Sequence, residues 1–171
     1  MKYLLVVLFL FFINGISAQE SPFQIYLEPL DVLEVGGLQV YANGQHDGKW
    51  LILGGRLDGL HERQPWASFD EAGMNTQIIV IDPVNKQKWT APLTSLSLAL
   101  QEQLSSTNMQ FQQTGDILYF LGGYGYSATA LNHITYNKLT AIDVPATIDA
   151  VINGTSFTDF FRQIFDEQFA G

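Results

Sequence analysis

Two glycine pairs, each at the end of a short apolar run, constrain the fold of this chain more than any other feature. The first run is LILGG at 51–55, and the second is LYFLGG at 118–123. Each follows a segment typical of a β-strand and a glycine-containing tight turn, at Gly48 and at Gly115. The two turn glycines are 67 positions apart, and the two glycine pairs are 68 apart. A fixed spacing of this kind indicates a repeated supersecondary unit.

The first unit is predicted to hold four antiparallel strands. Beyond the glycine pair and a long polar loop comes the β-branched run 78–81, bounded by a turn at 82–85. A further strand around Trp89 then completes a second hairpin. Pro92 follows this strand, as expected where a chain leaves a sheet.

The same strand order is predicted for the second unit. Its third strand is expected at 133–136, with a turn near 137–138 and a fourth strand at 139–144. Pro145 follows, in the place that Pro92 holds in the first unit. The second unit is therefore expected to end its sheet at residue 145.

A four-stranded antiparallel unit with a glycine pair after one strand and a tryptophan in a later hairpin resembles the kelch repeat of β-propellers. The residues that carry the resemblance are 51–55, 79–82 and Trp89 in the first unit and 118–123 in the second. Ile142 stands in the second unit at the place expected for the tryptophan. The resemblance implies an all-β fold of kelch-type propeller blades, with two blades and the start of a third, and membership of the galactose oxidase/kelch-like superfamily.

The domain organisation expected from these patterns has six segments: a signal peptide at 1–18, an N-terminal lead-in at 19–37, a kelch-like blade at 38–92, an inter-blade connection at 93–106, a second blade at 107–145, and a connection with the start of a third blade at 146–171. Apolar residues at mixed spacings predict a short helix within 93–103 and another within 148–165. The third blade is expected to begin near Phe169.

Blade number raises a further expectation, because propellers close with about four to eight blades. We expect that the chain is the N-terminal part of a longer protein or that several copies associate to complete a ring. A smaller β-sandwich is the alternative fold. The phenylalanines near the end of the chain are expected to form an exposed apolar patch; they are Phe157, Phe160, Phe161, Phe165 and Phe169.

The first eighteen residues have the pattern of a secretory signal peptide. Lys2 precedes an apolar run at 3–13, and small residues lead to Ala18, after which cleavage is predicted. The run is interrupted at Asn14 and is shorter than the roughly twenty residues that a membrane span needs. No later apolar stretch is long enough to span, so we expect a secreted or cell-envelope protein without a stable membrane anchor.

Composition excludes several classes of function. Eight Lys and Arg against 17 Asp and Glu give a net charge of −9, which disfavours nucleic acid as a partner. The chain has no cysteine, so no disulfide, thiolate metal site or thiol nucleophile is available in it. His46, His61 and His133 lack the spacing of metal ligands. We predict no metal site, no cofactor and no catalytic residues in this chain.

The loops after the two glycine pairs are the predicted ligand-binding surface, and both are expected on one face of the molecule. The first, at 56–75, is of a length that is often functional, and a tryptophan beside arginine is typical of binding hot spots and sugar platforms. The alternative is that Trp66 and Phe69 form a local core over the rim. The predicted ligand-binding residues are Arg56, His61, Arg63, Trp66, Tyr124 and Tyr126, and the predicted structural glycines are Gly54, Gly55, Gly122 and Gly123.

These observations favour a binding protein over an enzyme. The first hypothesis is a secreted kelch-repeat propeller that acts as a binding or scaffold module for protein or glycan partners at the cell surface. The alternative is part of a carbohydrate-active propeller enzyme, similar to a sugar isomerase or oxidase, whose catalytic residues lie mostly outside this chain. The copper oxidases of the family use a cysteine cross-linked to a tyrosine, and this chain has no cysteine to supply one.

Overall fold

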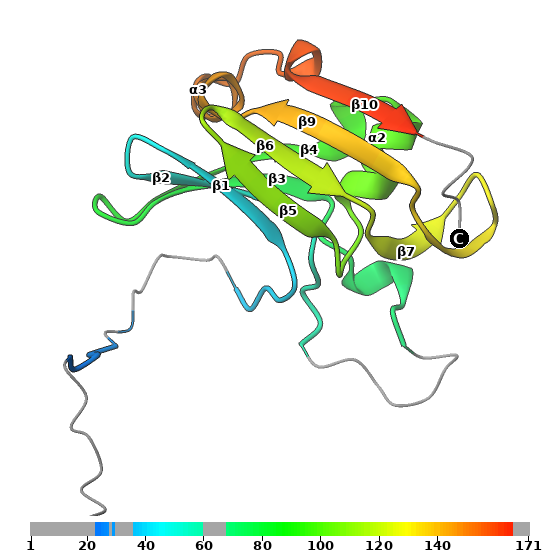
Figure 1. Cartoon of the computed structure of the whole chain (residues 1–171), viewed down its shortest axis with the longest axis horizontal. Coiled ribbons are helices and arrows are strands. Elements are labelled where there is room, and N and C mark those ends of the chain that lie inside the picture. Colours follow the sequence, from blue (N-terminus) through cyan, green and yellow to red (C-terminus); the bar gives the residue numbers. More distant parts are fainter. Residues whose placement is uncertain (1–22, 28, 30–35, 60–67, 166–171) are drawn as a thin grey trace, which may run out of the picture.

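A computed structural model describes residues 23–27, 29, 36–59 and 68–165 of the chain. These residues form a mostly β fold with ten strands, two α-helices and three short 3-10 helices (Figure 1). Eight of the strands form two four-stranded antiparallel sheets, and the other two form a separate hairpin. None of the helices in the described ranges has the length and apolar character needed to cross a membrane.

The first sheet has the order that the sequence predicts. Its strands follow one another in chain order: β1 (Ala42–His46), β2 (Lys49–Leu53), β3 (Gln77–Asp82) and β4 (Gln87–Pro92). Asp47 and Gly48 both have positive φ, at 48° and 72°, which suits the two-residue turn between β1 and β2. Asp82 shapes the turn to β4, because its Oδ1 accepts hydrogen bonds from the backbone N–H of Val84 and Asn85.

The second sheet differs from the prediction in its third and fourth strands. Its order is β10-β9-β6-β5, from β5 (Gln110–Thr114), β6 (Ile117–Leu121), β9 (Lys138–Asp143) and β10 (Phe161–Phe165). The segment predicted as the third strand, 133–136, instead falls largely in β8 (Asn132–Thr135), which pairs with β7 (Tyr124–Ser127) as the separate hairpin. The third strand is β9, which covers most of the segment predicted as the fourth.

A helix intervenes before the fourth strand of this sheet. The side chain of Asp143 accepts a hydrogen bond from the backbone N–H of Ala146, and Pro145 lies in the first helical turn, so α3 (Val144–Asn153) begins where a strand end was expected. The chain returns to the sheet at β10, beyond the predicted boundary at 145. Arg162, rather than Ile142, therefore holds the place of Trp89 in the second sheet.

The sequence repeat is also a structural repeat. Matching pairs in the two units are Gln39–Arg56 with Thr107–Tyr124, and Trp50–Ile81 with Leu118–Ile142. Val40 and Asn108, at matching places, have unusual positive φ values of 55° and 57°. The first two strands, the corner after them and the third strand thus follow the same register in both units.

The main core lies between the two sheets. In the first sheet, face A is the side that carries Leu51 and Leu53. In the second sheet, face B is the side that carries Leu118 and Phe120. In each sheet the other letter names the opposite side. Face A of the first sheet packs against face B of the second, and all four of these side chains are buried in one cluster. The helices α2 (Leu98–Leu104) and α3 contribute further buried side chains to it.

The expected patch of exposed phenylalanines is wrong. Phe157 and Phe161 are buried, with their ring centroids 6.1 Å apart, and Phe160 packs against the same core. They are buried because β10 belongs to the second sheet and turns Phe161 toward the first. The side chain of Phe165, and Phe169 with the expected third blade, lie outside the described residues.

The predicted helices are present with different bounds. The segment 93–103 contains the 3-10 helix η2 (Leu93–Ser95) and most of α2. The segment 148–165 holds the end of α3, the 3-10 helix η3 (Thr158–Phe160) and β10. In Figure 1 the second sheet lies across the first, with α3 at one end of it and α2 behind it.

Candidate functional site

The two glycine pairs form corners that meet at one point of the backbone. All four glycines have positive φ, between 66° and 101°. A Cβ on Gly54 would lie 2.6 Å from the carbonyl oxygen of Ser106, and one on Gly123 would overlap the hydroxyl of the same serine. Gly55 also donates its N–H to the Ser106 carbonyl, at 2.9 Å. Positive φ favours glycine at all four positions, and close approach of other atoms is a second reason at Gly54, Gly55 and Gly123.

Buried amide side chains satisfy the carbonyl groups of both corners. Asn75 donates to the carbonyl oxygen of Gly54 at 3.0 Å. Gln103, on α2, donates to the carbonyl oxygens of Gly122 at 3.2 Å and Lys138 at 2.8 Å. Sequence reasoning missed both residues, because a polar residue within a loop or an amphipathic helix is normally expected to face solvent.

The loops that leave the two corners come together in an aromatic cluster. The rings of Phe69 and Tyr124 meet edge to face with centroids 5.1 Å apart, and Tyr124 stacks on His133 at 5.8 Å. The Nε2 atom of His133 lies 2.9 Å from the carbonyl oxygen of Phe69. The expectation that the two loops share one face therefore agrees with these contacts.

Arg56 lies beneath this cluster. Its side chain is buried, forms an ion pair with Asp58 and donates to the carbonyl oxygen of Asp70 at 2.9 Å. The guanidinium carbon also lies 5.6 Å from the centre of the Phe69 ring. These contacts hold the loop against the sheet, so they position other residues rather than present the guanidinium to solvent.

The remaining predicted site residues divide into two groups. Tyr124 and Tyr126 are half-buried on β7, and both rings contact His133. His61, Arg63 and Trp66 lie in 60–67, outside the described residues. A ligand-binding role for any of these residues stays a prediction.

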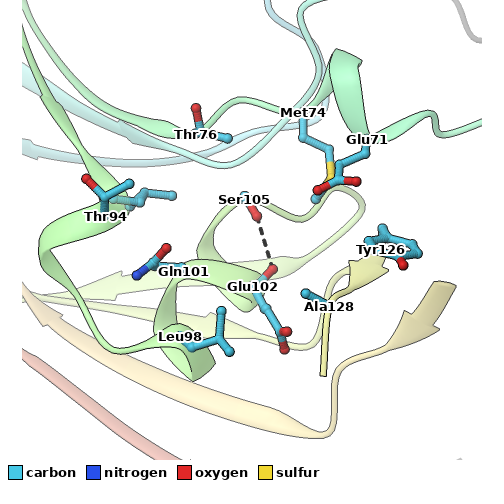
Figure 2. Close-up of a pocket in the computed structure, with 11 residues that line it drawn as sticks. Glu71, Met74, Thr76, Thr94, Leu98, Gln101, Glu102, Ser105, Tyr126 and Ala128 are labelled. Atoms are coloured by element: carbon cyan, nitrogen blue, oxygen red, sulfur yellow. Dashed lines mark hydrogen bonds between the residues drawn. The ribbon is translucent and has the colours of Figure 1, made fainter. Parts of the chain in front are cut away.

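A cavity of about 180 Å³ opens beside Tyr126 (Figure 2). It lies between the 3-10 helix η1 (Glu71–Gly73), η2, α2 and the β7 hairpin, and its walls are mostly apolar. The lining residues are Glu71, Met74, Thr76, Leu93, Thr94, Leu98, Gln101, Glu102, Ser105, Tyr126 and Ala128. The cavity is thus formed by segments that follow the first corner, the first sheet and the second corner.

Glu102 places a buried carboxylate in the wall of this cavity. One oxygen accepts hydrogen bonds from the backbone N–H of Thr129, at 2.8 Å, and from its hydroxyl, and the other accepts one from the hydroxyl of Ser127. Burial acts to raise the pKa of Glu102, but these hydrogen bonds outweigh it and hold the pKa below its ordinary value. The carboxylate is therefore ionised at neutral pH and fixes the β7–β8 turn to α2.

Tyr136 binds the backbone of the same hairpin through a hydrogen bond. Its hydroxyl donates to the carbonyl oxygen of Tyr126 at 3.0 Å. Burial raises the pKa of this hydroxyl, and the nearby Glu102 carboxylate raises it further. Tyr136 therefore stays protonated and holds the backbone of Tyr126 in place.

No group of three or more His, Asp or Glu residues in residues 23–27, 29, 36–59 and 68–165 is arranged to hold a metal ion. Polar groups at the cavity are either fixed by the fold, as Glu102 is, or exposed at the rim, as Glu71, Thr76 and Thr94 are. No family model matches this chain, and no curated protein matches it in sequence.

Proposed function

We propose that this chain is a secreted binding module of the kelch-propeller type, and that its cavity takes one sugar unit of a glycan partner. The observation that carries the proposal is that the loops after both glycine pairs converge beside α2 and form one cavity. A rigid sheet framework with a site on its connecting loops suits a binding protein.

The size and lining of the cavity support a sugar as the bound unit. About 180 Å³ is smaller than the pockets that hold whole drug-sized ligands, so it suits one small ring of a larger partner. The ring of Tyr126 and the apolar side chains of Met74 and Leu98 offer surface to the C–H face of a sugar. At the rim, the hydroxyl groups of Thr76 and Thr94 can form hydrogen bonds with the hydroxyl groups of the sugar.

Charge narrows the class of sugar. The ionised Glu102 lies in the cavity wall and Glu71 lies at its rim. The chain as a whole carries a charge of −9. We therefore infer a neutral or amino sugar, because an acidic sugar would be repelled.

The binding test uses the exported chain and a panel of neutral, amino and acidic oligosaccharides in titration calorimetry. We expect binding of a neutral or amino oligosaccharide, and a loss of at least about tenfold in affinity for Tyr126→Ala, which corresponds to about 1.4 kcal/mol. Tyr126→Phe keeps the ring and should keep the affinity. Tyr26→Ala is the matched control, because Tyr26 is exposed and does not line the cavity.

Two results would overturn the proposal. One is equal affinity in Tyr126→Ala and the unchanged chain. The other is binding of acidic oligosaccharides alone, because the two glutamates at the cavity would then have no role in selection. Circular dichroism of each variant separates a lost contact from a lost fold.

A further inference from the structure

The internal repeat leaves one apolar sheet face without a partner. Within the described residues, face A of the first sheet packs on face B of the second. Among these residues no sheet covers face A of the second sheet, which exposes Leu121 by 52%, Ile164 by 64% and Tyr119 by 39%. The strand register sets Leu121, Leu139 and Ile164 in one row across β6, β9 and β10.

At several positions this exposed face matches the buried face A of the first sheet, although Arg162 stands where the first sheet has Trp89. Leu51 and Leu53, which are fully buried, correspond to Tyr119 and Leu121. Ala91, packed on the core, corresponds to Ile164. Four of the second sheet's face A residues are thus apolar at places where the first sheet uses its apolar residues to bind another sheet; they are Tyr119, Leu121, Leu139 and Ile164.

The opposite end of the molecule carries the complementary surface. On face B of the first sheet, Ile52, Ile79 and Ile81 form a second apolar cluster, with Leu38, Tyr41 and Trp50 packed against it. Trp50 and Ile52 correspond to Leu118 and Phe120, the residues with which the second sheet binds the first. The three isoleucines are already buried, at 3–5% exposure, whereas Tyr41 and Trp50 are half-buried and keep part of their side chains at the surface of the cluster.

We propose that a second copy of this chain binds head to tail, with face B of its first sheet on face A of the second sheet. The contact would repeat the packing that already joins the two sheets within one chain. It is independent of the cavity proposed to bind a sugar. A head-to-tail contact either closes a ring or continues as a filament. Because propellers close with about four to eight sheets and the described residues form two four-stranded sheets, a ring would need about two to four copies.

The first experiment measures the mass of the exported chain by light scattering after size-exclusion chromatography over a range of concentrations. We expect a species of two to four chain masses that dissociates on dilution. Leu121→Glu, on face A, and Trp50→Glu, on face B, should each give a monomer. Ile164→Lys and Thr90→Arg change exposed residues of the same two faces. They replace the glutamate variants in this test if circular dichroism shows that either glutamate variant does not fold.

Mixing the variants tests the head-to-tail geometry itself. Leu121→Glu keeps face B and Trp50→Glu keeps face A, so a mixture should form a dimer of one copy of each and nothing larger. Self-association of Trp50→Glu alone would mean that two copies of face A bind each other, which overturns the proposal. A monomer at every concentration of the unchanged chain overturns it as well, and neither result bears on sugar binding.

Discussion

The two repeated units agree in their first three strands and differ in how they reach the fourth. In the first unit a short turn, with Asp82 at its start, leads from β3 directly to β4. In the second, Asp143 caps α3, and the chain returns as β10 only after 17 further residues, at 144–160. The same carboxylate position thus caps a turn in one unit and a helix in the other. The comparison shows that the fourth strand of the sheet can follow the third directly, or can pair with it after an intervening helix.

The inserted helix has a structural consequence that the short turn lacks. α3 contacts all four strands of the first sheet, although it belongs to the second unit. A Cβ on Gly44 of β1 would lie 2.9 Å from Val144, at the start of this helix. Gln113 of β5 adds a second connection, because its side chain bonds both the N–H and the carbonyl of Gln45. Features outside the repeat thus add to the shared core in holding the two units together.

The largest effect is expected at the glycine corners, where the two units are packed unequally. Gly54→Ala combines a positive φ of 66° with overlap against Ser106, so we expect a loss of about 3–5 kcal/mol in the free energy of unfolding. Gly122→Ala has similar strain at 70° but meets nothing closer than 3.6 Å, and about 1–2 kcal/mol is expected. Urea denaturation measures both. Equal losses would contradict the role assigned to Ser106.

The next effect concerns the amide that serves the second corner. Gln103→Leu removes hydrogen bonds to the Lys138 and Gly122 carbonyls and leaves the Thr140 hydroxyl without its acceptor. We expect about 2–4 kcal/mol of destabilisation, because buried polar groups are left unsatisfied. Gln112→Leu is the control, because the side chain of Gln112, on β5, is exposed. A loss for Gln103→Leu no larger than that of the control would refute the prediction.

A smaller, pH-dependent effect is expected at the hairpin of the second unit. The folded pKa of Glu102 lies below its ordinary value of 4.5, so its contribution to stability is complete above about pH 4.5 and is lost as the pH falls toward the folded pKa. Glu102→Gln should cost about 1–2 kcal/mol at pH 7 and less at low pH. Thermal unfolding from pH 3 to 7 tests this. An unchanged pH profile in the variant would show that another group is responsible.

The smallest effect is expected at the two capping aspartates that distinguish the units. Asp143→Ala removes the hydrogen bond to the N–H of Ala146 and should lower stability by about 1 kcal/mol, the usual value of a helix cap. Asp82→Ala should also destabilise, because Asn85 and Val84 lose their acceptor. Hydrogen exchange locates each change. For Asp143→Ala, faster exchange should appear at the start of α3; if it appeared in β4 instead, the assignment of the cap would be wrong.

The two loops predicted to bind a ligand meet in the structure, and their ligand-binding role stays a prediction. Both loops after the glycine pairs were predicted on one face, and Phe69 of the first contacts Tyr124 of the second. Arg56 was predicted at the surface, whereas the structure buries it beneath the loop. Glu102 and Gln101 of the cavity were missed, because they lie on a helix that sequence spacing does not connect to either loop. Of the alternative that Trp66 and Phe69 form a local core, Phe69 packs against Tyr124, and Trp66 lies outside the described residues.

The sequence by itself determined the corners, the tight turns and the whole first sheet. These features depend on local conformation: a positive φ at Gly54 and Gly122 selects glycine, and strands joined by short turns pair with their neighbours. Tertiary structure decided which segments fill the second sheet. β9 and β10 are separated by α3, and alternating side chains at 133–136 suit a hairpin as well as a sheet strand. The burial of Phe161 and the hydrogen bonds of Gln103 to partners far along the chain favour the observed pairings, and such contacts exist only once the two sheets are packed together.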